Sequence, residues 1–220
     1  MNRDTRTTLT PFAARVYGVA TILAPLLLLA STVAYITAGE GINEGVLGGT
    51  IGVWSAFAMT IAFVGILRLL EPRAPRAAVT LTVIALIGWA AGIAFNIEAI
   101  YVALIPELTV ERLNDAMTGG DAIAWLAFLP WGWFAPLTFV LSGIFLWRTH
   151  TVAPWTGILL IIGGVLFVTA RPARIDVLAV TGDIVLVLAL APIGWSMFVG
   201  RRLAGSAAMA TATAAPEPLH

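Results

Sequence analysis

The sequence contains no cysteine and no lysine, since all twelve of its basic residues are arginines. The lack of cysteine excludes disulfides, a thiolate nucleophile and cysteine-ligated zinc or iron–sulfur clusters. The lack of lysine excludes a Schiff base to retinal or pyridoxal phosphate, which needs a lysine amine. Only two histidines are present, His150 and His220, and this argues against a histidine-built metal site. We therefore expect no cofactor and no metal.

Charged residues are scarce as well. They make up 11% of the 220 residues, hydrophobic residues make up 60%, and the mean hydropathy is +0.96. Soluble globular domains carry about 25% charged residues, so this chain has too few polar residues to cover a water-facing surface. The net charge is zero, which argues against a nucleic-acid partner, because affinity for phosphates comes from clustered positive charge.

Long apolar runs organise the chain. Each approaches or exceeds the ~20 residues that an α-helix needs to cross a hydrocarbon core of ~30 Å. The six runs cover residues 15–38, 46–70, 77–105, 121–147, 154–170 and 175–199. Backbone amides in hydrocarbon must be satisfied within their own segment, and runs without polar alternation are helices rather than barrel strands. The sequence predicts an all-α, multi-pass membrane bundle with six transmembrane helices.

The distribution of arginine predicts the orientation of this bundle. Most arginines lie before the first run, between the second and third, between the fourth and fifth, and after the sixth. The alternate connections hold only Arg112, Arg171 and Arg174. The positive-inside rule then places both termini in the cytoplasm. Because a bias toward arginine and alanine is typical of GC-rich bacterial genomes, we expect the bacterial inner (plasma) membrane, with the lipid bilayer as partner; the oligomeric state stays open.

The short connections leave room for one membrane domain. We expect a cytoplasmic N-terminal segment over residues 1–14, a transmembrane domain over 15–202, and a disordered tail over 203–220, where alanine, threonine and proline show no periodic pattern. One connection, over residues 109–117, is predicted to form a short interfacial helix that ends at Gly119 and Gly120.

One hairpin has a recognisable pattern. It includes L-S-G-I-F-L-W-R at 141–148 and P-W-T-G-I-L-L-I-I-G-G-V-L at 154–166. This stretch resembles the hairpin between the fourth and fifth spans of small six-span bacterial membrane proteins of unknown function. The resemblance supports the number of spans and implies no activity.

Two acids within the apolar runs are the first candidates for a functional site. Glu98 lies in the third run and Asp183 in the sixth, both roughly 10 to 12 Å below the outer boundary. An ionisable side chain at such a depth costs roughly 2.5 to 3.5 kcal/mol on insertion scales. Asp176 shares the helical face of Asp183, so we expect an inward-facing acidic stripe. Arg171 and Arg174 lie at the same end, and a purely structural ion pair with these acids is the alternative to a functional site.

Aromatic and amide side chains lie at similar depth. Helical geometry places Tyr101 on the face of Glu98, and Asn96 and Trp89 on nearly the opposite face, which predicts that other helices surround the third run. Trp131 and Trp133 belong to L-P-W-G-W-F-A-P at 129–136, where two prolines and a glycine disturb the helix. Broken helix at membrane depth is tolerated where it lines a cavity, and a kinked, lipid-facing helix is the alternative.

These residues suggest three functions of different classes. The leading hypothesis is an acidic and aromatic cavity in the outer half of the bundle that binds or transports a small lipophilic or cationic molecule. Its expected ligand-binding residues are Glu98, Asp183, Asn96, Trp89, Trp131, Trp133, Tyr101 and Arg171.

The second hypothesis is an intramembrane enzyme acting on an isoprenoid substrate in the manner of a terpene cyclase. Glu98 and Asp183 would be its catalytic acid and base, and tryptophan faces would stabilise carbocations. The third is a non-catalytic membrane subunit or scaffold. The sequence contains no HExxH and no GxxxxGK[ST] motif, which disfavours zinc-protease and nucleotide-binding functions. Whether the chain is an enzyme stays open.

Overall fold

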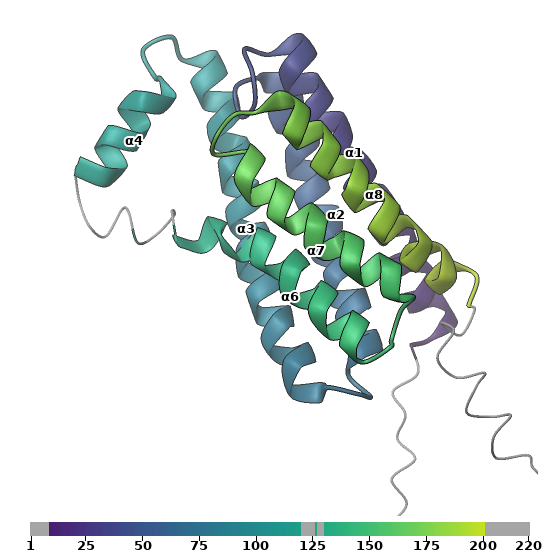
Figure 1. The fold of residues 1–220 in the computed structure, drawn as a ribbon. Coiled ribbons are helices and arrows are strands. Elements are labelled where there is room, and N and C mark those ends of the chain that lie inside the picture. The colour runs from purple at the N-terminus through teal and green to yellow at the C-terminus, as the bar shows by residue number, and fades with distance from the viewer. Residues whose placement is uncertain (1–8, 120–125, 127–129, 201–220) are drawn as a thin grey trace, which may run out of the picture.

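The computed structural model describes residues 9–119, 126 and 130–200. Within these residues the chain is helical, and its only β-pairing is the isolated bridge between Gly41 and Glu44. A turn at Trp133 separates the helical residues 130–132 from the helix that follows. The helices, labelled in Figure 1, are α1 (Pro11–Ala38), α2 (Val46–Leu70), α3 (Pro75–Leu104), α4 (Val110–Gly119), α6 (Phe134–Arg148), α7 (Pro154–Ala170) and α8 (Asp176–Phe198).

The predicted helical membrane architecture is confirmed at a coarse level. Five helices are long and apolar enough to cross a membrane: α1, α2, α3, α8 and the helix Pro130–Arg148 that contains α6. The apolar helix α7 is shorter, at 17 residues. Helices α2 and α7 have the bounds of the predicted runs, and α8 differs by one residue at each end. Several apolar helices of this kind fit a multi-pass membrane protein.

Helix α1 begins earlier than predicted because its N-terminus is capped. The side chain of Thr10 accepts a hydrogen bond from the backbone N–H of Ala13, and Pro11 occupies the first helical position, where its missing N–H costs nothing. The short helix predicted over residues 109–117 is present as α4, which stands away from the bundle in Figure 1. Its interfacial position stays a prediction. The predicted disordered tail, most of the N-terminal segment and most of residues 120–129 lie outside the described residues.

The long helices form a closed ring. Each packs on the next in the order α1, α2, α3, α6, α7, α8, and α8 packs on α1 (Figure 1). The closure between α8 and α1 depends on two glycines, because a Cβ atom built on Gly18 would lie 2.7 Å from the carbonyl oxygen of Gly194, and the reverse distance is the same. Small residues of this kind let membrane helices approach closely without a hydrophobic driving force between them.

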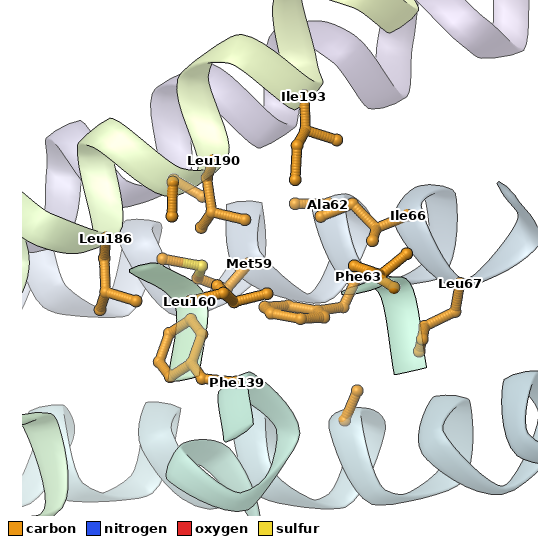
Figure 2. Close-up of a cluster of buried hydrophobic side chains, with 14 of the residues drawn as sticks. Met59, Ala62, Phe63, Ile66, Leu67, Phe139, Leu160, Leu186, Leu190 and Ile193 are labelled. Atoms are coloured by element: carbon orange, nitrogen blue, oxygen red, sulfur yellow. The ribbon is translucent and has the colours of Figure 1, made fainter. Parts of the chain in front are cut away.

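Bulky apolar side chains fill the middle of the ring. Figure 2 shows Met59, Phe63, Phe139, Leu160 and Leu186 converging from α2, α6, α7 and α8, and all five are fully buried. The outside of the ring is also apolar, with exposed side chains that include Leu23, Val79, Val83, Trp155 and Leu188. Soluble monomers rarely expose so much apolar surface, whereas a surface that contacts lipid requires it.

Candidate functional site

A pocket of about 390 Å³ lies at the end of the ring that carries the α1–α2 and α7–α8 connections. It extends from those connections down to the level of Leu28 and Trp89. This end of the bundle is the one predicted to face outward. The lining residues come from α1, α2, α3, α6, α7 and both connections; they include Asn43, Gly52, Trp89, Gly92, Phe95, Asn96, Glu98, Trp133, Phe167, Arg171 and Arg174.

Helix α3 contributes the largest share of the wall. Its lining residues are Trp89, Gly92, Phe95, Asn96 and Glu98. At 100° per residue, these positions cover about half of the helix circumference, with Trp89 at one edge and Glu98 at the other. The sequence places Asn96 and Glu98 on different faces, and both nevertheless line one pocket because the pocket curves around the helix.

Glu98 is the acid that lines this pocket. Its side chain is half-buried, and its Oε2 atom is buried without a hydrogen-bond partner. Within the described part of the chain, the ion pairs involve Arg171 and Arg174, and neither includes Glu98. Glu98 is therefore an uncompensated carboxyl group in the pocket wall.

Asp183 has the opposite environment. Its side chain is 2% exposed, and Nη2 of Arg171 lies 3.1 Å from its Oδ2 atom and 3.3 Å from Oδ1. The hydroxyl group of Thr32 donates a hydrogen bond of 2.5 Å to Oδ2, and Arg171 donates one of 2.9 Å to the same hydroxyl oxygen. The guanidinium group also lies 4.5 Å from the centroid of the Phe167 ring. This network ties α1, α7 and α8 together, and Asp183 is not among the lining residues.

A second ion pair joins the two connections at the mouth of the pocket. Nη2 of Arg174 lies 2.6 Å from Oε1 of Glu44, and both side chains are partly exposed. Arg174 and Asn43, one in each connection, have positive φ angles of 52° and 67°. The prediction of an inward-facing acidic stripe is wrong for Asp176, which is exposed because it begins α8 at the edge of the apolar region.

Asn96 is held by a residue that the sequence did not indicate. The hydroxyl group of Tyr35, which is 1% exposed, donates a hydrogen bond of 3.0 Å to Oδ1 of Asn96. Nδ2 of Asn96 donates to the backbone oxygen of Gly92 at 2.7 Å. Gly52 makes room for this arrangement, because a Cβ atom there would collide with Oδ1 of Asn96.

The three tryptophans predicted to bind the ligand lie in different environments. Trp89 is 3% exposed and packs between Phe63 and Phe139, at centroid distances of 6.2 and 5.3 Å, while its Nε1 atom has no partner. Trp133 lines the pocket and is 58% exposed. Trp131 packs edge-on against Phe134 at 5.5 Å and does not line the pocket.

The pocket thus unites five of the eight predicted ligand-binding residues: Trp89, Asn96, Glu98, Trp133 and Arg171. Asp183 lies behind Arg171. Tyr101 is 54% exposed and, like Trp131, lies outside the lining. Across the described residues, no group of three or more acidic or histidine side chains could hold a metal ion.

Comparisons with protein-family models, curated proteins and solved structures give no significant match for this chain. The resemblance of residues 141–166 to six-span bacterial proteins stays a prediction. The geometry of the pocket is therefore the basis for a proposed function.

Proposed function

We propose that the chain is a six-span protein of the bacterial inner membrane, with both termini in the cytoplasm, that binds a small lipophilic cation in the pocket beside Glu98. One observation carries the proposal: a carboxyl group in the pocket wall has a buried oxygen without a partner. An unpartnered buried polar atom costs about 1 to 3 kcal/mol, and a ligand that supplies the partner recovers this cost.

The charges around the pocket favour a cation. The positive charge of Arg171 is compensated by Asp183, and that of Arg174 by Glu44. Among the ionisable residues that line the pocket, Glu98 is left without an opposite charge in the described chain. A ligand of single positive charge would complete the balance, and the rings of Trp89 and Phe167 suit its apolar part. The volume of about 390 Å³ lies within the range of small-molecule sites.

Equilibrium binding tests this function. With the protein in lipid nanodiscs, octylammonium should bind saturably and with one site per chain, because it combines an apolar tail with a positive charge. Octan-1-ol, which has the same chain length and no charge, should partition into lipid without saturation and should not compete. Equal binding of the amine and the alcohol, or only non-saturable uptake of both, would remove the basis for a cation site.

Six spans require α7 to cross the membrane as well. Its 17 residues give a length of ~25 Å, close to the hydrocarbon thickness, and it packs between α6 and α8 in the ring. The chain has no cysteine, so single cysteines can be introduced without removing others. We expect Arg73→Cys and His150→Cys to react only with a thiol reagent on the cytoplasmic side, and Glu107→Cys and Ala173→Cys only on the outer side. Reaction of positions 150 and 173 from one side would exclude the sixth span.

The enzyme hypothesis loses its expected pair of acids. Glu98 lines the pocket, whereas Asp183 is sealed by Arg171 and Thr32, so the two carboxyl groups do not face one another across a shared space. Catalysis on an isoprenoid substrate stays a prediction that no contact in the described chain favours. The Arg171–Asp183 contact matches the structural ion pair that the scaffold hypothesis predicts, but that hypothesis offers no reason for the unpartnered Glu98.

A further inference from the structure

Unpartnered polar atoms gather at this pocket. In the part of the chain that the structure describes, four buried side-chain nitrogen or oxygen atoms have no hydrogen-bond partner: Trp89 Nε1, Glu98 Oε2, Ser142 Oγ and Arg171 Nε. Three of the four belong to residues that line the pocket; Ser142, on α6, does not. Buried polar groups in folded proteins are almost always paired, so three exceptions at one pocket indicate a missing partner.

The three atoms differ in hydrogen-bonding character. An indole Nε1–H and a guanidinium Nε–H can only donate, whereas an ionised carboxylate oxygen can only accept. An ammonium group alone satisfies only the carboxylate, and an ether or carbonyl oxygen alone satisfies only the two N–H groups. A hydroxyl group both donates and accepts, but it leaves the negative charge of Glu98 without an opposite charge. A tetraalkylammonium ion has no N–H and would satisfy none of them, and a simple alkylammonium ion would satisfy Glu98 alone.

We infer that the ligand of this pocket is a protonated amine that also carries a neutral oxygen acceptor. Its ammonium N–H donates to Glu98, and its oxygen accepts from the N–H groups of Trp89 and Arg171. Ethers, amides and alcohols with a nearby amino group form this class. The inference rests on the proposed function, since it names the chemistry of the cation that the same pocket binds.

A neutral oxygen fits better than an anionic one. The guanidinium group of Arg171 already contacts the carboxylate of Asp183 through Nη2. The same nitrogen donates to the hydroxyl group of Thr32 on α1. The charge of Arg171 is thereby compensated, and what remains is one N–H without an acceptor. Introducing a second anion would leave the pocket with surplus negative charge in addition to Glu98, at a high desolvation cost.

A matched pair of ligands tests the inference. Octylammonium and 2-(pentyloxy)ethylammonium have tails of equal length, and they differ in one CH₂ group replaced by an ether oxygen. Dissociation constants for both are measured in nanodiscs with the unsubstituted protein, with Trp89→Phe, which removes the indole N–H, and with Ser142→Ala as the control for an unpartnered atom outside the pocket. The ratio of the two constants within one protein cancels the different partitioning of the ligands into lipid.

We expect Trp89→Phe to shift this ratio by about fivefold in favour of octylammonium, the effect of losing one hydrogen bond, and Ser142→Ala to leave it unchanged. Because Trp89→Phe could disturb the aromatic core, the ¹⁵N-indole spectrum of the unsubstituted protein gives a second readout. The N–H signal of Trp89 should move downfield with the ether amine and not with octylammonium.

An unchanged ratio together with an unmoved indole signal would overturn the inference. If both amines still bind saturably in that case, the cation site stands and only the oxygen acceptor is wrong. If neither amine binds, the proposed function itself fails.

Discussion

Replacing Arg171 by methionine should lower the free energy of unfolding by about 3 to 5 kcal/mol, the largest loss of stability that we expect from a single substitution at this end of the bundle. The substitution removes the cation that lies 3.1 Å from Asp183. The carboxylate of Asp183, whose side chain is 2% exposed, then keeps the Thr32 hydroxyl group as its remaining donor. A buried charge without its counter-ion costs far more than the ion pair itself contributes. Unfolding in mixed detergent micelles, followed by circular dichroism, measures the effect.

Two further variants separate this mechanism from a general loss of packing. The double variant Arg171→Met with Asp183→Leu should recover most of the lost stability, because it removes both charges at once. Arg174→Gln should cost less than about 1 kcal/mol, because the pair with Glu44 is partly exposed. If Arg171→Met and Arg174→Gln were equally mild, the contact between Arg171 and Asp183 would not fix the helices.

Replacing Glu98 by glutamine should weaken the binding of octylammonium by at least tenfold, which corresponds to ~1.4 kcal/mol. Glutamine has nearly the shape of glutamate and lacks its negative charge, so the pocket keeps its volume and loses its attraction for a cation. The stability of the protein should not fall, because the oxygen concerned forms no hydrogen bond in the folded chain. Isothermal titration in nanodiscs, with thermal unfolding of the same preparations, measures both quantities.

The matched control for this variant is Glu44→Gln. Glu44 is an acid at the mouth of the pocket whose charge is already paired with Arg174, so its loss should change the affinity by less than about threefold. Equal weakening by both substitutions would mean that the general negative potential attracts the ligand. Undiminished binding in Glu98→Gln would remove Glu98 from the site.

The helices could be predicted from the sequence because lipid imposes a simple rule. A segment must be apolar over the whole hydrocarbon thickness, so the bounds of α2 and α7 follow from where the apolar runs begin and end. The ring order could not be predicted, because it depends on close contacts between residues far apart in the chain, such as Gly18 and Gly194. Glycine is frequent in all these runs, so its positions alone do not say which helices meet.

Only part of the site could be predicted from the sequence, because the rest also depends on contacts between distant residues. Glu98 and Asp183 attract notice because ionisable residues are rare in apolar runs, yet nothing local indicates that one lines a pocket and the other is sealed. That difference arises from Thr32, which lies 151 positions from Asp183, and from Arg171. Tyr35 was missed likewise, since its partner Asn96 lies 61 positions away. Single threonines and tyrosines in membrane helices are too common to indicate such contacts.

The most direct measurement is the distance between the bound cation and Glu98. Solid-state NMR of the protein with a ¹³C-labelled glutamate side chain at position 98 and ¹⁵N-labelled octylammonium in bilayers reports the separation of the ammonium nitrogen from the carboxyl carbon. We expect direct contact, with a separation of about 3 to 4 Å between these two atoms. A bound ligand whose nitrogen lies beyond about 6 Å from that carbon, outside direct ion-pair reach, would contradict it.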